Sequence, residues 1–167
     1  MPSTIVTLKV NGRAQEFLTR PGTTLLDALR DSLSLTASKK GCAQGTCGTC
    51  TVLLDGKPVF ACLVPVETVA GRSIETLEGL AAGDVLHPLQ ESFIALFATQ
   101  CGFCSSGMIM AAKGLLDRNP DPSRADVVRA ISGNVCRCTG YEAIIDAVLD
   151  AAAKMKKAAP SRRKAAE

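Results

Sequence analysis

Apolar and polar residues alternate along the first part of the chain, which is the pattern of β-strands with one buried face. Val6, Leu8 and Val10 all fall on the same face of such a strand. The pairs Asn11-Gly12 and Asp55-Gly56 are typical of two-residue turns, so the pattern predicts two hairpins. The segments that we expect to form strands are 4–10, 13–19, 51–54, 57–62 and 73–77.

One helix is predicted between the two hairpins. Thr24 is followed three residues later by Asp27, which is the spacing of a helix N-cap and its acidic partner. The leucines that follow repeat at helical spacing and form one apolar face: Leu25, Leu26, Leu29 and Leu33. Two hairpins, a helix that covers them and a last short strand describe a small α+β unit with one mixed sheet.

The apolar period changes from two to about 3.6 residues after Asp84, where the strand signals stop. Ser123 and Asp126 have the spacing of a helix-capping pair. Thr139 and Glu142 have the same spacing. We therefore expect four short helices in a bundle. Their apolar stripes are Leu89, Phe93, Leu96 and Phe97; Met108, Ala112 and Leu115; Val127, Val128 and Ile131; and Ile144, Ile145, Val148, Leu149 and Ala152.

These patterns divide the chain into a sheet domain over residues 1–78, a helical domain over 84–157 and a basic tail over 158–167. Six basic residues against one glutamate give the last 17 residues a charge of +5, so the remainder carries −2 of the net +3. A terminus of this composition is typically solvated, and contact with nucleic acid or a membrane surface is the less favoured interpretation.

Composition narrows the functional classes. The 167 residues are 47% hydrophobic, which is enough for globular cores, but only 4% are aromatic, with one Tyr and no Trp. Such a chain has little material for stacking on nucleobases, which disfavours nucleic-acid binding. No apolar run approaches the ~20 residues of a membrane span, and the N-terminus shows no secretion signal. We therefore expect a cytoplasmic protein, in which clustered cysteines are more often metal ligands than disulfides.

The eight cysteines fall into two groups of four. In the first group Cys42, Cys47 and Cys50 have the spacing C-x4-C-x2-C, and Cys62 follows on the second hairpin. This spacing is typical of plant-type [2Fe-2S] ferredoxins, whereas structural zinc sites usually show two short cysteine pairs. Glycine lets a loop approach an anionic cluster closely, and three glycines interleave with these cysteines: Gly41, Gly45 and Gly48.

The second group combines a C-x2-C pair, Cys101 and Cys104, with a C-x-C pair, Cys136 and Cys138. This spacing by itself fits either zinc or an iron-sulfur cluster. Cys104 starts one predicted helix and Cys138 directly precedes another, so two positive helix ends would face the site. Positive partial charge favours the reduced cluster of an electron carrier, but it would stabilise zinc as well.

Together these motifs resemble the small iron-sulfur subunit of the xanthine oxidase family of molybdenum hydroxylases. Carbon monoxide dehydrogenase, isoquinoline and quinoline oxidoreductases, nicotinate hydroxylase and 4-hydroxybenzoyl-CoA reductase have such subunits. The likeness runs from about Thr4 to Met155 and is carried by Cys62 and the segments 41–50, 99–104, 107–108 and 133–141. Ser105-Ser106 stand where Thr-Pro is commoner in the family, a departure that touches no ligand.

The resemblance implies a plant-ferredoxin-like β-grasp domain followed by an all-α four-helix-bundle domain, each with one [2Fe-2S] cluster. It also implies a large partner subunit with molybdopterin, expected in its cytosine dinucleotide form, and a medium subunit with FAD or another electron acceptor. Electrons would pass from molybdenum through the helical-domain cluster and then the ferredoxin-type cluster to that acceptor. This chain would be the non-catalytic electron-transfer subunit, and by motif position Gln100 and the ligand Cys138 would lie against the pterin.

Two other functions remain open at this point: a freestanding two-cluster redox carrier or sensor, and a zinc-stapled interaction module. The second domain argues against a simple ferredoxin, because one cluster domain suffices for shuttling electrons. Taken alone, Gln100 would be an ordinary polar residue at a helix end. His87, the only histidine, is expected to be an exposed residue beside a helix start rather than a ligand.

Overall fold

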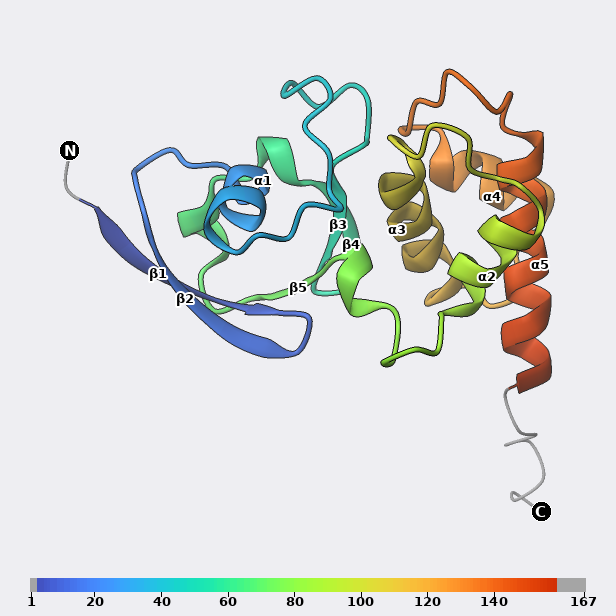
Figure 1. The fold of residues 1–167 in the computed structure, drawn as a ribbon, viewed down its shortest axis with the longest axis horizontal. Coiled ribbons are helices and arrows are strands. Elements are labelled where there is room, and N and C mark those ends of the chain that lie inside the picture. The colour runs from blue at the N-terminus through green and yellow to red at the C-terminus, as the bar shows by residue number, and fades with distance from the viewer. Residues whose placement is uncertain (1–2, 159–167) are drawn as a thin grey trace, which may run out of the picture.

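A five-stranded mixed sheet forms the first half of the protein in the computed structural model, which describes residues 3–158 (Figure 1). Its strands are β1 (Thr4–Val10), β2 (Arg13–Thr19), β3 (Thr51–Leu54), β4 (Lys57–Phe60) and β5 (Ser73–Glu75). They lie in the order β2-β1-β5-β3-β4, with β1 and β5 parallel and the other neighbouring pairs antiparallel. Val6, Leu8 and Val10 are buried, as the alternation predicts.

Both predicted hairpin turns are confirmed. The Asn11-Gly12 and Asp55-Gly56 pairs have φ angles between 47° and 79°. Positive φ at both central residues gives a turn whose twist matches that of the flanking strands. The second hairpin matters for the site. Because β3 and β4 pair side by side, the residues just before β3 lie next to those just after β4.

One short helix covers the sheet. α1 (Leu25–Asp27) continues into a π-helical turn over Ala28–Ser32. Thr24 caps the helix as predicted, since its Oγ1 accepts a hydrogen bond from the Asp27 N–H at 3.1 Å. The helical segment is shorter than the leucine spacing suggests, and Leu33, just beyond it, is only half-buried.

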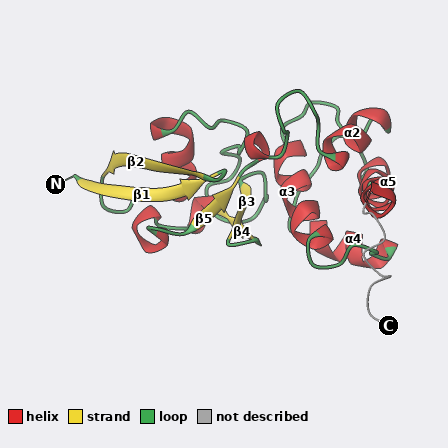
Figure 2. Ribbon diagram, turned by 90° about the horizontal axis from the view of Figure 1, so that it is seen from below, coloured by secondary structure: helices red, strands yellow, loops and turns green. Residues whose placement is uncertain are grey.

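Four helices form the second half, as the change of period predicts (Figure 2). They are α2 (Pro88–Ala95), α3 (Ser105–Leu116), α4 (Arg124–Ile131) and α5 (Glu142–Ala158). α2 packs along α5, and α3 contacts β3 on one side and α4 on the other, so α3 joins the two halves. Each half has its own apolar core. Because the sheet lies in the first half and the four helices α2 to α5 in the second, the chain is an α+β protein.

The apolar stripe predicted for α2 is wrong beyond Ala95, where the helix ends. Leu89 and Phe93 are buried as expected, but the Leu96 and Phe97 residues are 40% and 84% exposed. Phe97 has a φ of 52°, so the chain has already left the helical conformation at this position. Helical spacing no longer brings residues onto one face once the helix has ended.

The starts of α2 and α5 also differ from the predictions. His87 is a half-buried N-cap of α2 rather than an exposed neighbour, and its Nδ1 accepts a hydrogen bond from the Leu89 N–H at 3.2 Å. Burial lowers the pKa of His87, which favours the neutral ring that can accept this bond. Thr139 does not cap α5, because that helix begins at Glu142 and is directly preceded by Tyr141 with a φ of 71°. The capping pair predicted for α4 is confirmed.

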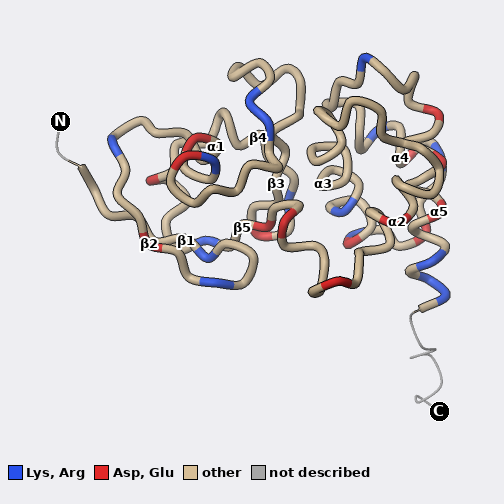
Figure 3. The backbone as a smooth tube through the Cα atoms, viewed as in Figure 1, with Lys and Arg blue, Asp and Glu red and all other residues tan. Residues whose placement is uncertain are grey.

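Lysines gather near the C-terminal end of α5 (Figure 3), and two of them pair with nearby acids. Lys154 lies 2.8 Å from an Asp150 carboxylate oxygen, and Lys156 lies 2.8 Å from one of Asp121. Residues 159–167, nearly all of the predicted tail, lie outside the described part of the chain. Among the helices of residues 3–158, none combines the length and hydropathy that a bilayer crossing requires.

Candidate metal centres

The first cysteine group gathers at one end of the sheet, in the loop that enters β3 and the turn that leaves β4 (Figure 1). Pairing of β3 with β4 places Cys62 beside Cys50, and the Ala61 N–H donates to the Cys50 carbonyl at 3.3 Å. The buried Cys62 thiol is near enough to affect the pKa of Cys50, and among the half-buried cysteines Cys47 is near enough to affect the pKa of Cys42. The structure thus brings together all four predicted residues of this group.

Close packing explains two glycines of this loop. A Cβ atom at Gly41 would lie 2.8 Å from Thr49 Oγ1 and 2.9 Å from Cys47 Sγ. Gly45 has a φ of 78°, and a Cβ there would collide with the Leu63 side chain. Side chains at these positions would therefore displace the wall of the site, including a sulfur atom.

Hydrogen bonds converge on the sulfur of Cys42. The N–H groups of Gln44 and Thr46 donate to Cys42 Sγ at 3.5 and 3.3 Å. The Thr46 hydroxyl and these backbone groups lower the pKa of Cys42 to about 5, so the metal-binding thiolate predominates at neutral pH. Burial raises the pKa of Cys50 to about 12, so that thiol needs a bound cation to ionise at neutral pH.

The second cysteine group forms where the start of α3 meets the loop between α4 and α5. At the surface, Cys101 Sγ and Cys138 Sγ lie 3.6 Å apart, and both residues are exposed. Cys104 and Cys136 are buried, and Cys136 is near enough to affect the pKa of Cys104. Burial raises the pKa of Cys104 to about 12. All four predicted residues of this group are therefore close together, again as two pairs.

The sulfur atoms of both groups fit a [2Fe-2S] cluster. Such a cluster takes four thiolates, two on each of its irons. Each group offers four thiols as two neighbouring pairs, and none of the eight cysteines is in a disulfide. Within residues 3–158, no three His, Cys, Asp or Glu side chains are grouped closely enough to hold a single metal ion.

Hydrogen bonds join the two cysteine groups directly. The Val135 N–H donates to the Cys47 carbonyl at 2.9 Å, and Cys136 is the next residue after Val135. The buried Asn134 side chain donates from Nδ2 to the Gly48 carbonyl at 2.8 Å. The path from Cys47 of the first group to Cys136 of the second thus runs through one hydrogen bond and one residue, Val135.

Small residues allow this close contact. A Cβ atom at Gly48 would collide with the Gly133 carbonyl oxygen and lie 2.7 Å from Asn134 Nδ2. A Cβ atom at Gly107, on α3, would collide with the Gly48 carbonyl oxygen. Sequence reasoning included Gly107, Gly133 and Asn134 only as positions of the motifs and gave them no role. Small residues beside predicted ligands were the signal that could have pointed to a close approach of two loops.

Tyr141 is a further residue that the sequence analysis assigned no role. Its hydroxyl accepts a hydrogen bond from the Cys136 N–H at 2.9 Å and donates to the Asn134 carbonyl at 3.3 Å. The only tyrosine of the chain therefore fixes the backbone on both sides of Val135. Its position inside the cysteine motif was the signal that could have found it.

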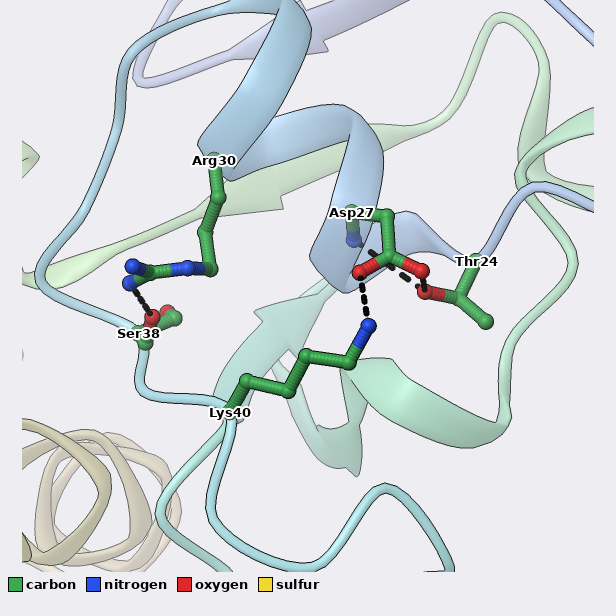
Figure 4. A network of polar contacts seen from close by, with 5 residues as sticks. All are labelled: Thr24, Asp27, Arg30, Ser38 and Lys40. Carbon is green, nitrogen blue, oxygen red and sulfur yellow. Dashed lines mark hydrogen bonds and ion pairs between the residues drawn. The ribbon is translucent and has the colours of Figure 1, made fainter.

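A polar network anchors the stem of the first cysteine loop to α1 (Figure 4). Lys40 Nζ lies 2.8 Å from Asp27 Oδ1, and the Thr24 hydroxyl donates to Asp27 Oδ2 at 2.9 Å. The Arg30 guanidinium donates to the Ser38 carbonyl at 2.7 Å. The hydrogen bond from Lys40 lowers the pKa of Asp27, so the carboxylate is ionised at neutral pH. The network fixes the direction in which the chain enters the cysteine loop.

The two residues predicted to contact a partner's cofactor lie on one exposed edge. Gln100 and Cys138 are both exposed. Cys101 follows Gln100 and contacts Cys138, so the two predicted residues are near each other. We call the edge formed by Gln100, Cys101 and Cys138 the outer edge of the second site.

Comparison with known proteins identifies both halves. Residues 8–80 match the family model of a 2Fe-2S iron-sulfur cluster binding domain, and residues 76–149 match that of a [2Fe-2S] binding domain. The chain is 48% identical over 146 residues to the nicotine 6-hydroxylase small subunit of Paenarthrobacter nicotinovorans, covering 87% of this chain and 88% of that one. It is 46% identical over 143 residues to the nicotinate dehydrogenase small FeS subunit of Eubacterium barkeri, covering 86% and 91% of the two chains.

Solved structures agree with these relatives. Quinoline 2-oxidoreductase from Pseudomonas putida 86 contains a chain with a TM-score of 0.90 and 46% identity, covering 94% of this chain and 98% of that one. Aldehyde oxidoreductase from Desulfovibrio desulfuricans gives a TM-score of 0.89 at 51% identity, covering 92% of this chain but only 17% of that longer one. The chain therefore belongs to the small iron-sulfur subunits of the xanthine oxidase family of molybdenum hydroxylases, and it is a non-catalytic, electron-transferring subunit of an oxidoreductase.

Proposed function

We propose that the chain binds two [2Fe-2S] clusters, the first through Cys42, Cys47, Cys50 and Cys62 and the second through Cys101, Cys104, Cys136 and Cys138. The first site belongs to a β-grasp, ferredoxin-like domain over residues 1–78, and the second to a four-helix-bundle domain over 84–157. Two sets of four thiols in neighbouring pairs, none of them in a disulfide, support this assignment. The zinc-stapled module loses its support, because both matching models are [2Fe-2S] domains.

The partner is a large subunit that carries molybdopterin in its cytosine dinucleotide form and docks on the outer edge of the second site. Gln100 and Cys138 then face the pterin. The exposure of this edge and the small-subunit names of the relatives support the docking. The electron acceptor is FAD on a medium subunit or another carrier. The complex is cytoplasmic, since in a reducing compartment clustered cysteines are more often metal ligands than disulfides.

Each cluster, when bound, accepts and releases one electron. The chain itself holds the two sites in a fixed relation and keeps their inner sulfur pairs away from water. The hydrogen bond from the Val135 N–H to the Cys47 carbonyl carries this proposal, because it connects the two cysteine groups without an intervening side chain. Tyr141 and Asn134 hold the backbone around that bond.

The purified protein is expected to contain about four iron and four acid-labile sulfide per chain, because eight thiolates complete two [2Fe-2S] sites. It should be red-brown, and metal analysis with sulfide determination checks the stoichiometry. A colourless protein with about two zinc ions per chain would contradict the proposal, since one zinc ion takes four cysteines.

Gln100→Ala should leave both clusters in place but slow their reduction through the molybdenum subunit, because the side chain that aligns the pterin is lost. Stopped-flow reduction of the assembled enzyme measures this, using whichever of nicotinate, quinoline or an aldehyde it oxidises. Gln44→Ala is the matched control, since Gln44 is also exposed but lies beside Cys42 of the first site. Equal reduction rates for both variants and the unmodified enzyme, with this transfer rate-limiting, would remove Gln100 from the pterin contact.

A further inference from the structure

The hydroxyl group of Thr139 lies at a sulfur atom of the second site. Its Oγ1 donates to Cys136 Sγ at 3.1 Å. The same oxygen accepts a hydrogen bond from the Tyr141 N–H at 3.2 Å. The Thr139 hydroxyl thus forms its hydrogen bonds within the cysteine loop, although the spacing of Thr139 from Glu142 is that of a helix cap.

The Tyr141 N–H fixes the direction of the Thr139 hydroxyl. A hydroxyl has one hydrogen to donate and two lone pairs that accept. Because Tyr141 occupies a lone pair, the hydrogen is free to point at Cys136 Sγ. Tyr141 has a positive φ of 71°, which turns the chain just before α5. The Tyr141 hydroxyl accepts a hydrogen bond from the Cys136 N–H at 2.9 Å. The loop therefore holds Thr139 as a donor to sulfur.

A second threonine near a sulfur provides a contrast. Thr49 Oγ1 lies 3.3 Å from Cys47 Sγ in the first site, but it also donates to the Lys39 carbonyl at 3.0 Å. Its single hydrogen has two competing acceptors, and the carbonyl is the closer one. Thr139 therefore commits its hydroxyl hydrogen to a cysteine sulfur more fully than Thr49 does.

We propose that Thr139 is a positioning residue that raises the reduction potential of the second centre by donating its hydroxyl hydrogen to Cys136. The inference rests on the proposed function, in which Cys136 is a cluster ligand. Reduction adds negative charge to the cluster and its sulfurs, so a hydrogen bond to sulfur stabilises the reduced state more than the oxidised state. Without the hydroxyl, the second centre is harder to reduce.

The experiment is a redox titration of both clusters by electron paramagnetic resonance in the full chain. Thr139→Val keeps the shape of the side chain but removes the hydroxyl, and Thr139→Ser restores it. For Thr139→Val we expect the reduction equilibrium constant of the second centre to fall about tenfold, a shift of about 59 mV to lower potential for one electron. Thr139→Ser should titrate like the unmodified protein, and the first centre should not shift in either variant.

Thr99→Val is the matched control near the second site, because the Thr99 hydroxyl contacts Ser105 Oγ at 3.0 Å rather than a sulfur. An unchanged second potential in Thr139→Val, or an equal shift in Thr139→Ser or Thr99→Val, would overturn the inference. Thr139→Ala serves as a smaller substitute if the valine variant does not retain the cluster. Loss of the second cluster from both Thr139→Val and Thr139→Ala would also overturn the inference, because the hydroxyl would then be needed to retain the cluster rather than to set its potential. Absence of two clusters from the unmodified protein would instead contradict the proposed function itself.

Discussion

Gly48→Ala is expected to separate the two halves of the protein and to disrupt both metal centres. The added Cβ would overlap the Gly133 carbonyl oxygen, which is backbone and cannot rotate away. Relief of this overlap breaks the hydrogen bonds from Val135 to Cys47 and from Asn134 to Gly48. The free energy of unfolding should fall by about 3 kcal/mol more than the positive φ alone would cost, because the contact is overpacked and buried polar groups lose their partners.

Gly56→Ala is the control that isolates the backbone strain. Gly56 has a φ of 76°, close to the 69° of Gly48, but a Cβ there meets nothing within 4 Å. This control should lose only about 1–2 kcal/mol, the usual cost of a left-handed residue with a side chain. Denaturant unfolding together with iron content measures both variants. Equal destabilisation of the two would show that the contact between the halves tolerates a methyl group at position 48.

Cys47→Ser is expected to abolish one of two distinct paramagnetic signals of the reduced protein and to halve its iron content. The two centres should be distinguishable because one lies in a glycine-rich loop of the sheet and the other between helix starts. Cys47 is half-buried at the first site, and a serine hydroxyl does not provide the thiolate that the iron needs.

Cys104→Ser is the mirror experiment for the second site. Cys104 is buried next to Cys136, so this variant should lose the other signal and keep the one that Cys47→Ser loses. Loss of both signals in either variant, with the protein still folded by circular dichroism, would show that the division of the cysteines into two groups is wrong.

Much of the fold could be predicted from the sequence because the signals are local. The alternation through Val6 and Leu8 and the Asn11-Gly12 turn specify a hairpin within a few residues. The grouping of the cysteines was also predictable, since Cys50 and Cys62 flank a hairpin that necessarily brings its ends together. Four helices in the second half follow from the period of their apolar residues.

Local patterns failed at two places near the ends of helices. Thr139 has the spacing of a helix cap, but its hydroxyl bonds a cysteine sulfur instead, and the helix starts after Tyr141. Phe97 continues an apolar stripe in the sequence, yet the chain leaves α2 before reaching it. For Thr139 the sequence pattern permits two conformations, and the contact with the cysteine sulfur accompanies the one adopted.

The sequence by itself determined the hairpins and the helices, since each depends on residue types at short, regular spacings, and it predicted the division of the cysteines into two groups. Only the tertiary structure decided how the groups meet. Asn134 and the Gly48 carbonyl are 86 residues apart in the chain, and their hydrogen bond depends on where α3 and the sheet place both backbones. Such a contact leaves no periodic signal, because its geometry is set by packing between distant elements rather than by neighbouring residues.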